Sequence, residues 1–132
     1  MTRHLAIFVG DAIEKIFRGE KVVEGRFSES RIIPFASVMR GDEIYLKQSG
    51  GPVLGRVSVD NVLYFEGLDG ATIGKLRREY QQEMVVDDTF WRTHGKAHYA
   101  TLIFLKCPRR FAVPLVIKKK DRRSWQILGP LP

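Results

Sequence analysis

The chain has 132 residues, of which 44% are hydrophobic and 28% charged. Its 22 basic residues against 15 acidic ones give a net charge of +7. This length suffices for one hydrophobic core and is short for two, so we expect a single domain over residues 1–132. No apolar run approaches the ~18 residues of a membrane span, so no membrane partner is expected. The excess positive charge favours polyanions as partners.

The single cysteine and the N-terminus bear on the cellular compartment. Cys107 has no second cysteine with which to form a disulfide, and we interpret it as a packing residue at a strand end before Pro108. The apolar run 4–9 is too short for the core of a signal peptide, and Asp11 follows it closely. We therefore expect a cytoplasmic protein.

The first half of the chain predicts one short helix among strands. Asp11 and Glu14 are typical of an acidic helix start, because carboxylates are favoured at the positive end of the helix dipole. Apolar residues follow at helical spacing until Gly19, which indicates the helix end. A bulge is expected near residues 60–61, and the third and fourth strands should form a hairpin. The expected strands are 4–9, 21–27, 43–48 and 53–66.

The second half predicts two helices followed by strands. Apolar residues at helical spacing indicate a helix over 72–84, and a shorter helix is expected over 87–94. The near-continuous apolar run within 96–106 is typical of a central strand. Pro114 interrupts the stretch that follows, so this part should be an edge or leave the sheet. A last strand is expected over 125–128, before a tail that contains proline.

The densest charge cluster lies between the first helix and the second strand. Side chains alternate along a strand, so Glu24 and Arg26 share a face. Lys21 directly follows the glycine turn and can swing round to meet Glu24. One carboxylate between two cations suits binding of an anion better than proton abstraction by the lysine. The alternative is a solvated row of charges on an edge strand.

A second basic cluster lies near the C-terminus and is flanked by aromatic residues. Cations neutralise phosphates and an aromatic face stacks a base, so the run predicts binding of single-stranded nucleic acid. In the alternative reading the lysines form a solvated hairpin tip and Trp125 belongs to the core. The candidate nucleic-acid-binding residues are Lys118, Lys119, Lys120, Arg122, Arg123 and Trp125.

His98 and Tyr99 are candidate pocket residues beside the central strand, although a structural histidine is an equally good interpretation. His94 and His98 are four residues apart, but Gly95 separates them and no third ligand completes a zinc site. We therefore expect neither a metal nor another cofactor.

Gly19, Lys21, Glu24 and Arg26 spell Gly-x-Lys-x-x-Glu-x-Arg, which resembles the signature of the ASCH family. Three later segments also resemble bacterial ASCH proteins, and they cover residues 41–47, 98–103 and 120–125. The resemblance implies an α+β fold, a PUA-like mixed β-barrel of about six strands with two to three flanking helices. It also implies a relation to RNA-binding and RNA-modification domains.

The resemblance makes an RNA-binding or modified-nucleotide-binding module the predicted function, with Lys21, Glu24, Arg26, His98 and Tyr99 as ligand-binding residues. The first alternative is an enzyme in which Lys21 and Glu24 are catalytic. Some relatives are amidohydrolases that act on acetylcytidine with a threonine three residues after the lysine, a place that Glu24 takes here. Others are ribonucleases, for which this chain offers no extra motif. The second alternative is a protein-interaction domain. Neither the base specificity nor the oligomeric state follows from the sequence.

Overall fold

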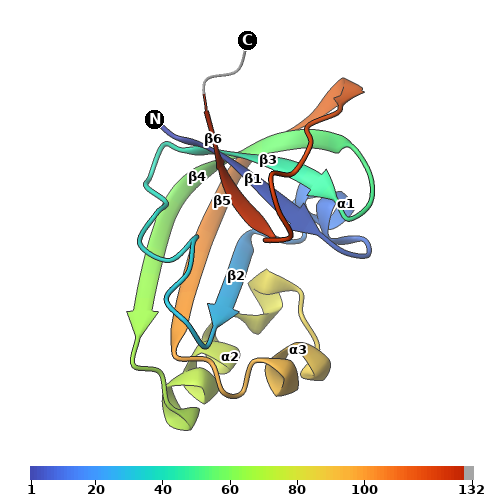
Figure 1. Cartoon of the computed structure of the whole chain (residues 1–132). Coiled ribbons are helices and arrows are strands. Elements are labelled where there is room, and N and C mark those ends of the chain that lie inside the picture. Colours follow the sequence, from blue (N-terminus) through green and yellow to red (C-terminus); the bar gives the residue numbers. More distant parts are fainter. Residues whose placement is uncertain (130–132) are drawn as a thin grey trace.

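Six strands and three helices follow one another along residues 1–129, the part of the chain that this computed structural model describes (Figure 1). They are β1 (Arg3–Phe8), α1 (Ala12–Phe17), β2 (Val23–Ser28), β3 (Glu43–Gln48), β4 (Val53–Glu66), α2 (Gly70–Met84), α3 (Asp88–Thr93), β5 (Tyr99–Leu115) and β6 (Trp125–Leu128). The proline-containing tail beyond residue 129 lies outside the described residues.

All six strands belong to one curled sheet, in the order β2-β5-β4-β3-β1-β6. β1 and β3 are parallel and the other neighbours are antiparallel, so the sheet is mixed. β2 and β6 are the two edges of this half-barrel, and α2 and α3 lie together at one end of it (Figure 1). The predicted α+β class is confirmed. None of the described helices has both the length and the apolar character that crossing a membrane requires.

Alternating side chains and turn glycines explain most of the strand positions. Along the first half of β4 every second residue is buried, among them Val53, Val57 and Val59, so this face covers the core. β3 and β4 form the predicted hairpin, and the register shifts between Val59 and Asn61 close to the predicted bulge.

β5 supports both parts of the core because its first half lies between β2 and β4. Residues Ala100 to Ile103 are all buried, as expected for a central strand. Ile103 packs in the cluster around Trp125, and Leu102 packs under the helices with Met84 and Trp91. The strands therefore hold the α2–α3 end and the β1–β6 end in fixed relation.

Three local expectations need correction. β5 does not break at Pro114 but continues to Leu115, whereas the expected edge position of this part is confirmed, because beyond Lys106 it pairs with β4 alone and its free edge tolerates prolines. Cys107 is exposed and has a φ of 53°, so it does not pack in the core. Asp11 makes no side-chain cap bond, and its carboxylate instead lies 3.4 Å from the Lys15 ammonium.

Candidate ligand-binding site

Lys21 and Glu24 form a buried ion pair. Lys21 lies in the segment that connects α1 to β2, and Glu24 lies near the start of β2. Gly19 adopts a φ of 76° and turns the chain, as expected, so that Lys21 points back toward Glu24. The Lys21 Nζ lies 3.0 Å from Glu24 Oε1 and also donates to the Met84 carbonyl oxygen at 2.5 Å. That carbonyl belongs to the last turn of α2, where a cation is favoured by the helix dipole.

Arg26 completes the triad and joins distant segments. Its Nε lies 2.8 Å from Glu24 Oε2, as the shared strand face predicts. Its Nη2 donates to the Ile7 carbonyl oxygen at 2.9 Å, and its Nη1 lies 3.2 Å from the Ser124 Oγ. The guanidinium lies over the rings of Phe8 and Trp125, 5.0 and 5.2 Å from the ring centres. We call Lys21, Glu24 and Arg26 the charged triad.

The charged triad is almost fully shielded from water. The side chains of Lys21, Glu24 and Arg26 are 5%, 10% and 16% exposed. Burial by itself raises the pKa of Glu24, but the charges of Lys21 and Arg26 and their hydrogen bonds outweigh it. The pKa of Glu24 therefore lies below its ordinary value, and the carboxylate stays ionised. Two cations against one carboxylate leave an excess positive charge.

The charged triad lies in the wall of a hollow of about 380 Å³, which we call the motif hollow. Ser124 also lines it. Most of the remaining wall is apolar or aromatic, and comes from β1, β2 and the α2–α3 region. The wall residues that matter below are Phe8, Phe27, Val85, Val86, Phe90 and His94. A buried charge cluster in a largely apolar wall is the pattern of a ligand site.

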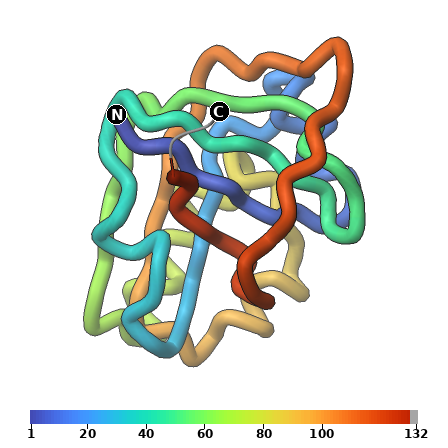
Figure 2. Tube along the Cα trace, turned by 45° about the horizontal axis from the view of Figure 1, so that its top comes forward, coloured from blue at the N-terminus to red at the C-terminus, as the bar shows by residue number. Residues whose placement is uncertain are grey.

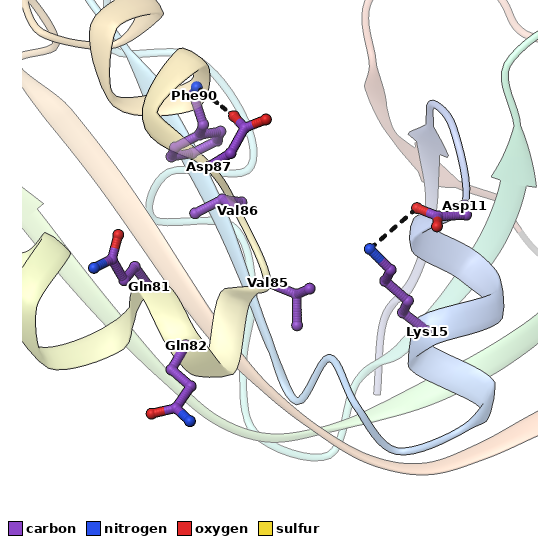
Figure 3. Close-up of a pocket in the computed structure, with 8 residues that line it drawn as sticks. All are labelled: Asp11, Lys15, Gln81, Gln82, Val85, Val86, Asp87 and Phe90. Atoms are coloured by element: carbon purple, nitrogen blue, oxygen red, sulfur yellow. Dashed lines mark hydrogen bonds and ion pairs between the residues drawn. The ribbon is translucent and has the colours of Figure 1, made fainter.

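An open groove of about 600 Å³ adjoins the motif hollow and shares Val85, Val86 and Phe90 with it. Figure 3 shows Val85 and Val86 on the connection between α2 and α3 and Phe90 on α3, across from Lys15 on α1 and Asp11 just before it. Asp11 and Asp87 contribute two carboxylates to this groove, whereas Lys15 contributes one ammonium that is paired with Asp11. The groove is therefore a poor path for a phosphate backbone.

The other two predicted pocket residues do not line the motif hollow. His98 is exposed and does not line the motif hollow. Tyr99 packs against Phe35 and lines a smaller pocket of about 60 Å³, which Arg26 and Ser124 also border. His94 is the histidine that lines the motif hollow, and burial lowers its pKa. Within residues 1–129 no group of three potential ligands is placed to hold a metal ion.

The C-terminal basic run is exposed, but its tryptophan is not. Figure 2 shows this segment returning from the far end of β5 to β6. Arg123 pairs with Asp121 at 2.8 Å, and the other four cations of the run make no ion pair within residues 1–129. We call Lys118, Lys119, Lys120 and Arg122 the basic patch.

Trp125 is 1% exposed and donates its indole N–H to the His4 Nδ1 at 3.1 Å. Its ring has no open face for a base, which agrees with the alternative interpretation in which Trp125 belongs to the core. Its ring instead supports Arg26, and His4 in turn bonds the buried Asp42 at 2.9 Å. The tryptophan is thus a structural neighbour of the charged triad.

Sequence reasoning missed Ser124, Phe8 and Phe90 as site residues. Ser124 is 98 positions from Arg26, so no spacing rule connects the two. Phe8 was assigned only to a buried strand, and it is buried at the end of β1, but it also contributes to the wall of the motif hollow. The sequence showed Phe90 only as an apolar residue in the helix predicted over 87–94, and this does not mark it as a site residue.

Solved structures share this fold. The crystal structure of ASCH from Zymomonas mobilis superposes with a TM-score of 0.74 over 96% of this chain and 87% of that chain, at 16% sequence identity. A tyrosine-to-phenylalanine mutant of the same protein gives a TM-score of 0.75 over 98% and 91%, also at 16% identity. A hypothetical protein gives 0.54 over 80% and 97%, at 17% identity. No family model and no curated protein matches the sequence.

These likenesses establish the architecture. The six-stranded curled half-barrel with three helices is an α+β fold that matches these ASCH structures. Within residues 1–129 this chain has the ASCH-domain fold, and the predicted likeness to that family is confirmed at the level of structure.

Proposed function

We propose that this protein binds single-stranded RNA or a nucleotide, with the base in the motif hollow and the phosphates on the basic patch. The observation that carries the proposal is the charged triad, which is buried in a largely apolar hollow. Ionised side chains are costly to bury, and such clusters are concentrated at functional sites.

The basic patch supports the assignment of the phosphates. Its four cations are exposed and free of ion pairs within residues 1–129, so each is available to a phosphate. Ser124 links the two regions, because it directly follows Arg123 and also lines the motif hollow. The carboxylates of the neighbouring groove repel phosphates and direct the backbone toward the patch.

The two regions have separate roles. Phosphate contacts position a nucleic acid and contribute affinity that depends on salt, whereas contacts to its bases specify it. The basic patch therefore supplies affinity, and the motif hollow supplies selectivity. With Trp125, Phe8 and Phe27 all buried, stacking falls to Phe90, the half-buried ring of the hollow.

The test is a titration of labelled single-stranded RNA at several salt concentrations. The variant Lys119→Ala/Arg122→Ala should bind more weakly and lower the slope of log affinity against log salt by about 1.4, at roughly 0.7 per lost contact. The matched control Lys75→Ala/Arg78→Ala removes the same charge from the exposed face of α2 and should bind as the wild type does. Absence of salt-dependent binding by the wild type, or equal weakening of both variants, would overturn the proposal.

A further inference from the structure

We infer that Val85 contacts the ligand, and that together with Val9 it forms an apolar rim of the motif hollow that packs against the base. This inference rests on the proposed function and adds two residues to the part of the site that holds the base. It follows from two observations, a backbone conformation at Val85 that disfavours valine and the place where the side chain lies.

Val85 ends α2 with a left-handed backbone, at a φ of 53° and a ψ of 56°. Its N–H donates to the Gln82 carbonyl oxygen at 3.3 Å, and the Val86 N–H donates to the Gln81 carbonyl oxygen at 3.5 Å. These two bonds form a Schellman motif, in which the left-handed position is usually glycine. The left-handed conformation is costly for a side chain that branches at Cβ. A glycine would therefore end α2 with less strain.

The packing that accompanies this helix end comes from Val86 rather than from Val85. In a Schellman motif the residue after the left-handed one makes the hydrophobic contact with the end of the helix. Val86 is half-buried and, like Tyr80 on α2, packs against the core cluster that contains Leu76. The side chain of Val85 is 36% exposed. The end of α2 therefore gives no reason for a valine at position 85.

The Val85 side chain lies where the motif hollow meets the open groove, and it lines both. Figure 3 shows it pointing from the end of α2 toward α1. Val9, directly after β1, also lines the motif hollow and is 74% exposed. We call Val85 and Val9 the apolar rim. A ligand that enters the hollow covers two aliphatic side chains that are otherwise in contact with water, and this burial favours binding.

The apolar rim suits a base and not a phosphate. Methyl groups form no hydrogen bond with a phosphate, and a charge that leaves water without a partner is strongly disfavoured. The face of a base is apolar and loses little when aliphatic groups cover it. Phe90 lines the same two spaces as Val85, so an aromatic ring for stacking is available beside the rim. Loss of the rim should therefore weaken binding only where a base is present.

The experiment compares a short single-stranded RNA of mixed sequence with an abasic ribose-phosphate oligomer of the same length, in the same salt. Val85→Asn replaces the two methyl groups with an amide, and asparagine tolerates the left-handed backbone. The relief of strain should raise the melting temperature by about 3 °C. The variant should bind the RNA about fivefold more weakly and the abasic oligomer as the wild type does. Val85→Gly, which removes the side chain, should behave in the same way.

Cys107→Gly is the matched control, because Cys107 has the same φ of 53° but lines neither the motif hollow nor the groove. It should raise the melting temperature and leave both affinities unchanged. Val9→Ser changes the other half of the rim without a change in backbone strain, and it should weaken the RNA alone. Unchanged RNA binding in Val85→Gly and Val9→Ser, or equal weakening of both oligomers, would overturn the inference and leave RNA binding itself intact. Absence of RNA binding by the wild type would instead overturn the proposed function.

Discussion

Arg26 on β2 donates a hydrogen bond from its Nη2 to the main-chain oxygen of Ile7 on β1, 2.9 Å away. β6 pairs with β1 only from Arg3 to Ala6, so Ile7 lies just beyond that pairing. Since β2 is the opposite edge of the sheet, this one side chain bridges the opening of the half-barrel. Arg26, which the motif predicts to be functional, therefore also helps to hold the half-barrel closed.

Replacing Arg26 with lysine should destabilise the fold. A lysine keeps the charge but loses the planar fork that contacts Glu24, Ile7 and Ser124 together. We expect the free energy of unfolding in urea to fall by about 2 kcal/mol. Arg31→Lys is the control, because Arg31 is exposed and only lies over the Phe35 ring. Its free energy of unfolding should change by less than about 0.5 kcal/mol. Equal losses of stability in Arg26→Lys and Arg31→Lys would show that Arg26 does not hold the half-barrel closed.

Gly55 should tolerate alanine less well than Gly25 does. A Cβ at Gly55 would lie 2.3 Å from the Arg109 carbonyl oxygen, which belongs to the backbone of β5 and cannot move aside. A Cβ at Gly25 would lie 2.3 Å from the Met84 Cε, the end of a flexible side chain. Unfolding in urea should show a loss of about 3 kcal/mol for Gly55→Ala and about 1 kcal/mol for Gly25→Ala.

Gly70→Ala provides the control for these two glycines. It begins α2 with nothing within 4 Å of an added Cβ, so alanine there should be neutral or slightly stabilising. A stable Gly55→Ala protein would show that β4 and β5 can separate without cost.

Stability should decline in acid through Glu24. Burial raises the pKa of this carboxyl, but Lys21 and Arg26 bring it below its unfolded value of about 4.3. The unfolded chain then binds the proton more readily, so the contribution is complete above about pH 5 and is lost as the pH falls through the folded pKa. Urea unfolding between pH 3 and 7 should show the decline below about pH 4.

Glu24→Gln should be less stable than the wild type at pH 7 and should flatten part of that acid decline. Asp42 titrates in the same direction, because bonds from His4 and two main-chain N–H groups outweigh the burial that raises its pKa. Some decline should therefore persist in the variant. Parallel curves for the variant and the wild type would assign the acid sensitivity to other carboxyls.

The protein should not release cytidine from acetylcytidine. The Lys21 Nζ is held between Glu24 Oε1 at 3.0 Å and the Met84 carbonyl oxygen at 2.5 Å, and Glu24 stands where the amidohydrolases that the motif resembles have a threonine. Incubation with acetylcytidine and chromatography of the products checks this. Turnover of about 1 per second or faster that disappears in Lys21→Ala would establish an enzyme in place of the binding module.

Local pattern determined much of the scaffold. Alternation and turn residues predicted β3, β4 and β6 with the bounds that the structure has, because strand pleat and turn chemistry depend on near neighbours. The same alternation predicted the contact of Glu24 with Arg26, and the glycine turn predicted the approach of Lys21. These three residues lie within six positions, so their geometry is a property of one short segment.

What surrounds the charged triad was decided by tertiary structure. Met84 and Ser124 lie 63 and 98 positions from Lys21 and Arg26 along the chain, and they reach them only because α2 packs beside β2 and the sheet curls. The same closure buries Trp125 under Arg26 instead of leaving it to stack a base. The alternation of side chains along a strand predicts which face of the sheet a residue lies on. The residues that it contacts on that face depend on how the sheet twists and how its edges approach each other.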